Sequence, residues 1–139
     1  MAQFKHILCP VDFSPCARAA LTMATELAAS SSAALMLAHV WEISPYVAPG
    51  VLSAGAAVET LLEDAEAQLA EWAASAKTTH TTLVRGVPWA EIVRLLEHDR
   101  TYDLTVLATH GRTGLKRVLV GSVAERVVRH APCAVLVVR

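Results

Sequence analysis

The sequence contains little cysteine and no long apolar run. Its three cysteines, Cys9, Cys16 and Cys133, are odd in number and widely spaced. Disulfide scaffolds use dense, even sets of cysteine, so we expect reduced thiols and a cytoplasmic protein. No stretch approaches about 18 consecutive apolar residues, so no membrane-spanning helix is expected. The chain also reaches Pro10 and Asp12 too early for the apolar core of a signal peptide.

Charge is also scarce, and its signs are mixed. Charged residues make up 18% of the chain, the formal net charge is −1, and like charges form no block. We therefore expect no nucleic-acid partner, because no basic field would attract one. The histidines and cysteines form no His-x-x-x-His or Cys-x-x-Cys pair, which argues against structural zinc. With 54% hydrophobic residues the chain can fill one core, and we expect a single domain over residues 1–139.

Short apolar runs alternate with segments of helical periodicity along the chain. Ser14 followed by Pro15 is typical of a helix start, with a side-chain cap and then proline at the first helical position. Residues 44–55 are rich in Pro, Gly and Ser, and a loop of this length is often a lid. We expect strands over 4–11, 34–41, 80–85, 103–109 and 133–138, helices over 15–30, 58–72, 90–98 and 122–130, and a turn at 86–89.

This alternation predicts a three-layer α/β fold. Strand-helix units in series favour a parallel sheet with helices on both faces and right-handed crossovers. The expected arrangement is a Rossmann-like, five-stranded parallel sheet in the order 3-2-1-4-5. Ligands in such sheets bind beyond the carboxyl ends of the strands where the strand order reverses, here between the first and fourth strands. The loop over 10–14 and the stretch over 108–122 should therefore lie side by side.

The stretch over 108–122, ATHGRTGLKRVLVGS, combines glycines with cationic side chains. It is not a Walker A loop, because none of its glycines is followed by lysine. Gly121 and Ser122 open the predicted helix, and the backbone N–H groups of a helix start bind phosphate readily. Gly111 permits a close backbone approach to a ligand. The stretch is consistent with an anion-binding loop to which Arg112 adds positive charge.

Simpler interpretations of the same residues remain open. Ser122 and Glu125 also fit a capping box, in which the serine caps the helix and the glutamate reaches back. Asp12 can cap the first helix or its turn instead of contacting a ligand. His110 can be a solvated loop residue and His39 a packed strand residue, and a buried, inert thiol is the better interpretation of Cys9.

Three segments of the chain resemble the universal stress protein family. They are KHILCPVDFSPCARAAL, LMLAHVWE and DLTVLATHGRTGLKRVLVGSVAERVVRHAPCAVLVV. The nucleotide-binding branch of that family carries Gly, two residues, Gly, nine residues, Gly, then Ser or Thr. Gly111, Gly121 and Ser122 match this pattern, whereas Ala108 stands where the family has its first Gly. The resemblance implies an adenine nucleotide α-hydrolase-like fold that binds ATP, or AMP or ADP, with or without Mg²⁺.

The resemblance also implies a role for each part of the site. Residues Pro10, Val11 and Asp12 would flank adenine and ribose, Val40 would offer backbone groups to the adenine edge, and Leu107 would pack near the base. The backbone of Ala108, Thr109, His110, Gly111, Arg112, Thr113 and Gly114 would wrap ribose and phosphates, and Gly121, Ser122 and Val123 would complete the phosphate site. Asp12 is also the residue that could reach Mg²⁺ through water. The strand from Cys133 to Val138 would pair with its copy in a homodimer.

Three function classes follow. The first is a dimeric, ATP-binding regulatory or stress-response module with at most slow hydrolysis. The second is an adenine-nucleotide-processing enzyme on the same scaffold, and the third is a stress protein that binds no nucleotide. The sequence lacks His-x-Gly-His, Ser-Gly-Gly-x-Asp-Ser and Gly-x-Ser-x-Gly elements, and no catalytic residue is assigned. Fast phosphoryl transfer needs more positioned groups than one acid and a few cations, so the first class is favoured.

Overall fold

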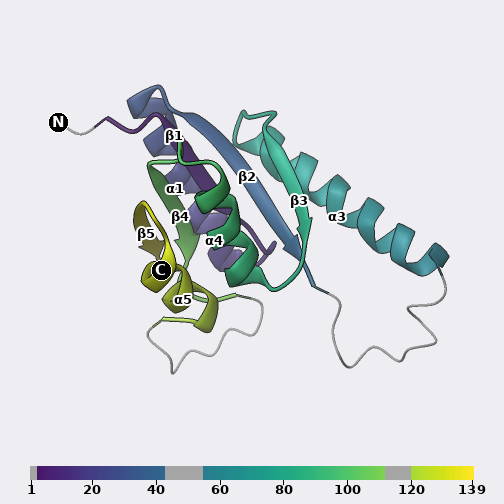
Figure 1. The fold of residues 1–139 in the computed structure, drawn as a ribbon. Coiled ribbons are helices and arrows are strands. Elements are labelled where there is room, and N and C mark those ends of the chain that lie inside the picture. Colours follow the sequence, from purple (N-terminus) through teal and green to yellow (C-terminus); the bar gives the residue numbers. More distant parts are fainter. Residues whose placement is uncertain (1–2, 43–54, 112–119) are drawn as a thin grey trace.

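The computed structural model describes residues 3–42, 55–111 and 120–139 (Figure 1). Residues 44–54 of the predicted loop, and Arg112, Thr113 and Gly114, lie outside the described residues. The strands are β1 (His6–Pro10), β2 (Ala34–Trp41), β3 (Thr81–Arg85), β4 (Leu104–Ala108) and β5 (Ala134–Val138), and the described helices are α1 (Pro15–Ser31), α3 (Gly55–Ser75), α4 (Pro88–His98) and α5 (Ser122–His130).

The strands form a parallel sheet in the order β3-β2-β1-β4-β5. Helices α1 and α3 cover one face, and α4 and α5 cover the other (Figure 1). The predicted Rossmann-like class and strand order are therefore confirmed. Because β1 and β4 are neighbours and the order reverses between them, the loops after these strands meet at one edge of the sheet. None of the helices in the described ranges is long and apolar enough to span a membrane.

Helix α1 forms as its local sequence predicts. The Ser14 side chain accepts a hydrogen bond of 3.1 Å from the N–H of Ala17, and Pro15 occupies the first turn. The helix ends at Ser32, which adopts a left-handed conformation with φ of 55°. Its buried face is made largely of small side chains, which let the helix lie close to the sheet. These are Ala17, Ala20, Ala24 and Ala28.

The core lies on both faces of the two central strands. Ile7, Leu8, Cys9 and Val106 are fully buried. Each large apolar side chain buried in this way contributes about 1.5–3 kcal/mol to the stability of the fold. Burial also raises the pKa of the Cys9 thiol to about 12, so this cysteine is inert, as expected.

Several predicted element boundaries differ from the structure, most of all those of α4 and α3. Helix α4 begins at Pro88 rather than at residue 90, so Trp89 belongs to the helix and not to the turn. Val87 caps it without a side-chain hydrogen bond, and the turn is made at Gly86, whose φ is 154°. Helix α3 begins at Gly55 rather than at residue 58. Proline in the first turn is a helix-start signal. Pro88 therefore marks the start of α4, whereas the prediction placed it inside a turn over residues 86–89.

Candidate functional site

A cleft of about 700 Å³ opens beyond the carboxyl ends of β1, β2 and β4 and beside the start of α5. Its volume lies within the range of small-molecule sites, about 300–1,000 Å³. All the predicted site residues that the structure describes line it, and they are Pro10, Val11, Asp12, Val40, Leu107, Ala108, Thr109, His110, Gly111, Gly121, Ser122 and Val123. Residues from three strand ends and one helix start are thus brought together around a single space.

The loop after β1 and the loop after β4 touch at Asp12 and Gly111. A Cβ atom placed on Gly111 would lie 2.7 Å from Oδ2 of Asp12, which is closer than packed atoms come. The other carboxylate oxygen of Asp12, Oδ1, accepts a 3.0 Å hydrogen bond from the N–H of Ser14. Asp12 therefore shapes the turn before α1 and also lines the cleft, and its contact with a ligand stays a prediction.

Gly121 joins the start of α5 to the end of β4. Its N–H donates a 2.6 Å hydrogen bond to the carbonyl oxygen of Thr109, and a Cβ at this position would lie 2.5 Å from that same oxygen. Because this oxygen belongs to the backbone, it cannot rotate away as the end of a side chain could. Glycine at 121 is therefore required by packing alone, whether or not a ligand binds.

The capping-box interpretation of Ser122 is wrong. Gly121 is the N-cap residue of α5, and the helix start has no side-chain cap hydrogen bond. Ser122 is exposed at the edge of the cleft. Glu125 accepts a 2.7 Å hydrogen bond from Arg129 instead of reaching back to the helix start. The capping-box pattern requires Ser122 itself to be the N-cap residue, whereas α5 begins one residue earlier, with Gly121 at the N-cap and its N–H bonded to the carbonyl oxygen of Thr109.

Ala108 fits its position without backbone strain. It ends β4, and the non-glycine residues of positive φ in the described ranges are Phe13, Ser32 and Lys77. A methyl group is tolerated wherever φ is negative, so the departure from glycine at 108 does not distort this strand end.

Sequence reasoning missed cleft residues on β2 and α4. His39, Trp41 and Glu42 line the cleft beside Val40, and Pro88 lines it from the start of α4. His39 is buried, as predicted for a packed strand residue. Its Nδ1 lies 2.8 Å from the carbonyl oxygen of Val11, and its ring centroid lies 4.4 Å from that of Phe13. The position of all three at the carboxyl end of β2 was the signal that could have identified them.

The described part of the cleft carries acids and imidazoles but neither lysine nor arginine. Its carboxylates are those of Asp12, Glu42 and Glu125, and its imidazoles are those of His39 and His110. Attraction for an anion must therefore come, among these residues, from the backbone N–H groups and dipole at the start of α5. Within the described ranges, no group of three or more His, Cys, Asp or Glu residues is arranged to hold a metal ion.

Comparison with known proteins relates nearly the whole chain to one family. The sequence profile of the universal stress protein family matches residues 3–139. Universal stress protein MJ0531 of Methanocaldococcus jannaschii is 37% identical over 144 residues, which cover 98% of this chain and 82% of that protein.

Two solved structures have a similar fold. Universal stress protein UspA of Lactobacillus plantarum superposes with a TM-score of 0.82 at 32% identity, and the match covers 100% of both chains. A universal stress protein solved in complex with cAMP matches with a TM-score of 0.67 at 24% identity, over 99% of this chain and 98% of the other. At that identity the likeness is one of fold.

Proposed function

This chain belongs to the universal stress protein family, and we propose that it binds an adenine nucleotide in the cleft beyond β1, β2 and β4. The observation that carries the proposal is the convergence of Asp12, Gly111 and Gly121 on one side of this cleft. Their contacts bring a helix start, a strand end and a carboxylate around a space of nucleotide size. The cAMP complex of a similar fold supports the choice of ligand class.

The cleft offers different chemistry to each part of a nucleotide. Val11, Val40 and Leu107 supply an apolar slot for the base. Asp12 can accept hydrogen bonds from ribose hydroxyls, and the N–H groups at the start of α5 can donate to phosphate oxygens. On the family pattern, Arg112 to Gly114 would complete the phosphate side. Mg²⁺ would arrive with the phosphates, with Asp12 reached through water.

We propose a regulatory, ATP-binding stress module of the cytoplasm, with slow hydrolysis at most. Rapid phosphoryl transfer needs a fixed metal, a group that orients water and cations that stabilise developing charge. The described cleft offers isolated carboxylates and imidazoles and no lysine or arginine. A regulatory module only has to hold or release the nucleotide as conditions in the cell change. For that it needs the binding site and no catalytic groups.

The homodimer proposed for this protein would pair β5 with its copy. β5 lies at the end of the sheet and pairs with β4 along one side. An exposed edge strand of this apolar composition, AVLVV, is normally covered. In sedimentation equilibrium at high salt we expect twice the chain mass, together with slow hydrogen exchange of the β5 amides. A monomer with fast-exchanging β5 amides would refute the dimer.

Nucleotide binding is tested by denaturing the purified protein and analysing the supernatant, followed by calorimetric titration of the emptied protein with ATP, AMP and cAMP. Released or titrated adenine nucleotide at near one per chain supports the proposal. An empty protein that binds none of the three would favour the nucleotide-free class. Turnover approaching the enzyme median of about 10 per second would favour the enzyme class.

A further inference from the structure

Helix α3 presents an acidic face that the proposed nucleotide site does not use. Its 21 residues include five carboxylates and neither lysine nor arginine. Glu59, Glu63 and Glu66, spaced by four and three residues, form one row that we call the α3 acidic face. All five carboxylate residues are exposed, and the ion pairs in the described part of the chain, Glu91–Arg94 and Glu125–Arg129, do not involve them.

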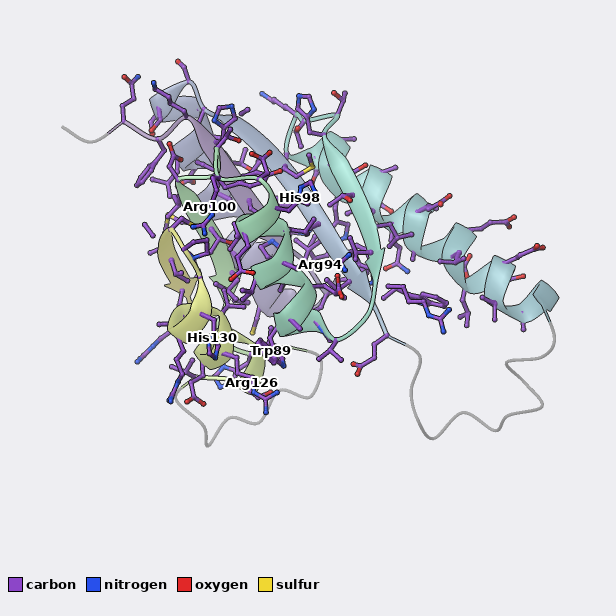
Figure 2. The ribbon with its side chains drawn as sticks, viewed as in Figure 1. Trp89, Arg94, His98, Arg100, Arg126 and His130 are labelled. Atoms are coloured by element: carbon purple, nitrogen blue, oxygen red, sulfur yellow. The ribbon has the colours of Figure 1, made fainter. Side chains whose placement is uncertain are left out.

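The first half of α3 also extends past the sheet. The helix reaches outward beyond β3 (Figure 1), and side-chain oxygen atoms lie along its length (Figure 2). Among the α3 residues whose burial is described, Ala65 is the first buried one, whereas Leu61, one turn earlier, is 56% exposed. Like charges four residues apart weaken an isolated helix by about 0.2–0.5 kcal/mol per pair. An exposed leucine beside such a row gives this part of the helix both charge and apolar area with which to contact another molecule.

A complementary surface lies at the other end of the molecule. Arg126, Arg129 and His130 are exposed on α5, and we call them the α5 basic face. Arg129 is paired there with the exposed Glu125 at 2.7 Å, so a docking carboxylate would compete with Glu125 for it. The guanidinium carbon of Arg126 lies 5.3 Å from the centroid of the Trp89 ring, and the His130 ring lies 5.6 Å from it, tilted by 33°. Figure 2 shows Trp89, Arg126 and His130 gathered where α4 meets α5. Contact with the Trp89 ring holds the Arg126 and His130 side chains in place.

We propose that the α3 acidic face of one copy docks on the α5 basic face of a second copy, beside Trp89. The two faces lie at opposite ends of one chain (Figure 1), so they cannot meet within a single copy. The overhang of α3 lets it reach a neighbour, and Leu61 can pack beside the partly exposed Trp89. Such a contact is heterologous, so it adds copies head to tail instead of closing a symmetric pair. It uses neither the nucleotide cleft nor β5.

The test is a charge-reversal exchange followed by sedimentation velocity. One variant carries Glu59→Lys and Glu63→Lys, and the other carries Arg126→Glu and Arg129→Glu. The wild-type chain should form species larger than its basal state, and these should weaken at least tenfold between about 0.1 M and 1 M salt, where the Debye length falls from about 10 Å to 3 Å. Each variant alone should lose these species. A mixture of the two should restore them, because each reversed face then meets its opposite.

Matched controls change the same net charge elsewhere. Glu26→Lys with Glu97→Lys, and Lys5→Glu with Lys77→Glu, alter exposed residues outside both faces and should leave the association intact. Restoration in the mixture also shows that both variants are folded. The proposal is overturned if the wild type shows no salt-sensitive association, if either variant alone associates normally, or if the mixture fails to restore it. A charged face that serves only solubility would give the first of these results.

Discussion

Gly111 lies so close to Asp12 that a Cβ atom at 111 would come within 2.7 Å of the carboxylate oxygen Oδ2. The other oxygen of that carboxylate holds the N–H of Ser14 at 3.0 Å. One contact therefore connects the loop after β4 to the turn that starts α1. Both residues line the cleft, so the contact fixes how these two loops meet in its wall.

We predict that Gly111→Ala weakens nucleotide binding while the protein still folds. The added methyl group forces the Asp12 carboxylate to turn, and its bond to the Ser14 N–H is strained or lost. A typical intramolecular hydrogen bond contributes about 0.5–1.5 kcal/mol. Calorimetry should show a loss of ATP affinity of about two- to tenfold, with a small decrease in the unfolding free energy. Gly55→Ala is the matched control, because no atom lies within 4 Å of that Cβ position; equal effects of the two variants would contradict the prediction.

Gly121→Ala should destabilise the fold itself. Its Cβ would lie 2.5 Å from the carbonyl oxygen of Thr109, which cannot move without disturbing the end of β4. Overpacking of this kind costs about 1–3 kcal/mol. Chemical denaturation of the nucleotide-free protein should show that loss as a lower midpoint. An unchanged midpoint would mean that the start of α5 is more adaptable than its contacts indicate.

Asp12→Asn separates the structural role of Asp12 from its proposed ribose contact. The amide oxygen of asparagine can still accept from the Ser14 N–H, so the unfolding free energy should change by less than about 0.5 kcal/mol. A hydrogen bond to a charged group is worth about 1.5–3 kcal/mol, so ATP affinity should fall tenfold or more. The variant should bind 2′,3′-dideoxy-ATP as the wild type does. If both ligands lose affinity equally, Asp12 does not contact the ribose hydroxyls.

Cys9 should resist alkylation in the folded protein. Burial raises its pKa from 9.0 to about 12, so almost no thiolate forms at pH 8. Iodoacetamide at pH 8 should modify the half-buried Cys16 and Cys133 first, and Cys9 only after denaturant is added, as peptide mass spectrometry would show. Because the folded pKa is the higher one, this group's contribution to stability is complete below pH 9 and is lost as the pH rises from 9 towards 12. Modification of Cys9 at the same rate as Cys16 would show local opening of β1.

The strands were predictable because their signal is local. Short apolar runs such as 34–41 are separated by helical periodicity, and the handedness of the crossovers leaves few sheet orders open. The α4 start was missed because the turn at Gly86 and the proline at 88 were assigned to one feature. The cleft residues His39 and Glu42 were missed because nothing in their own sequence marks them, whereas the strand end on which they lie does.

The sequence alone determined the order of the elements, the strand order and the pair of loops that meet where that order reverses, because periodicity and chain handedness act along the chain. Tertiary structure alone decided which atoms touch there. Whether Gly121 or Ser122 caps α5, and how Asp12 shares its oxygens between Ser14 and the loop at Gly111, depends on how α5 and the loops after β1 and β4 pack against one another. That packing joins residues far apart in sequence, and no local pattern encodes it.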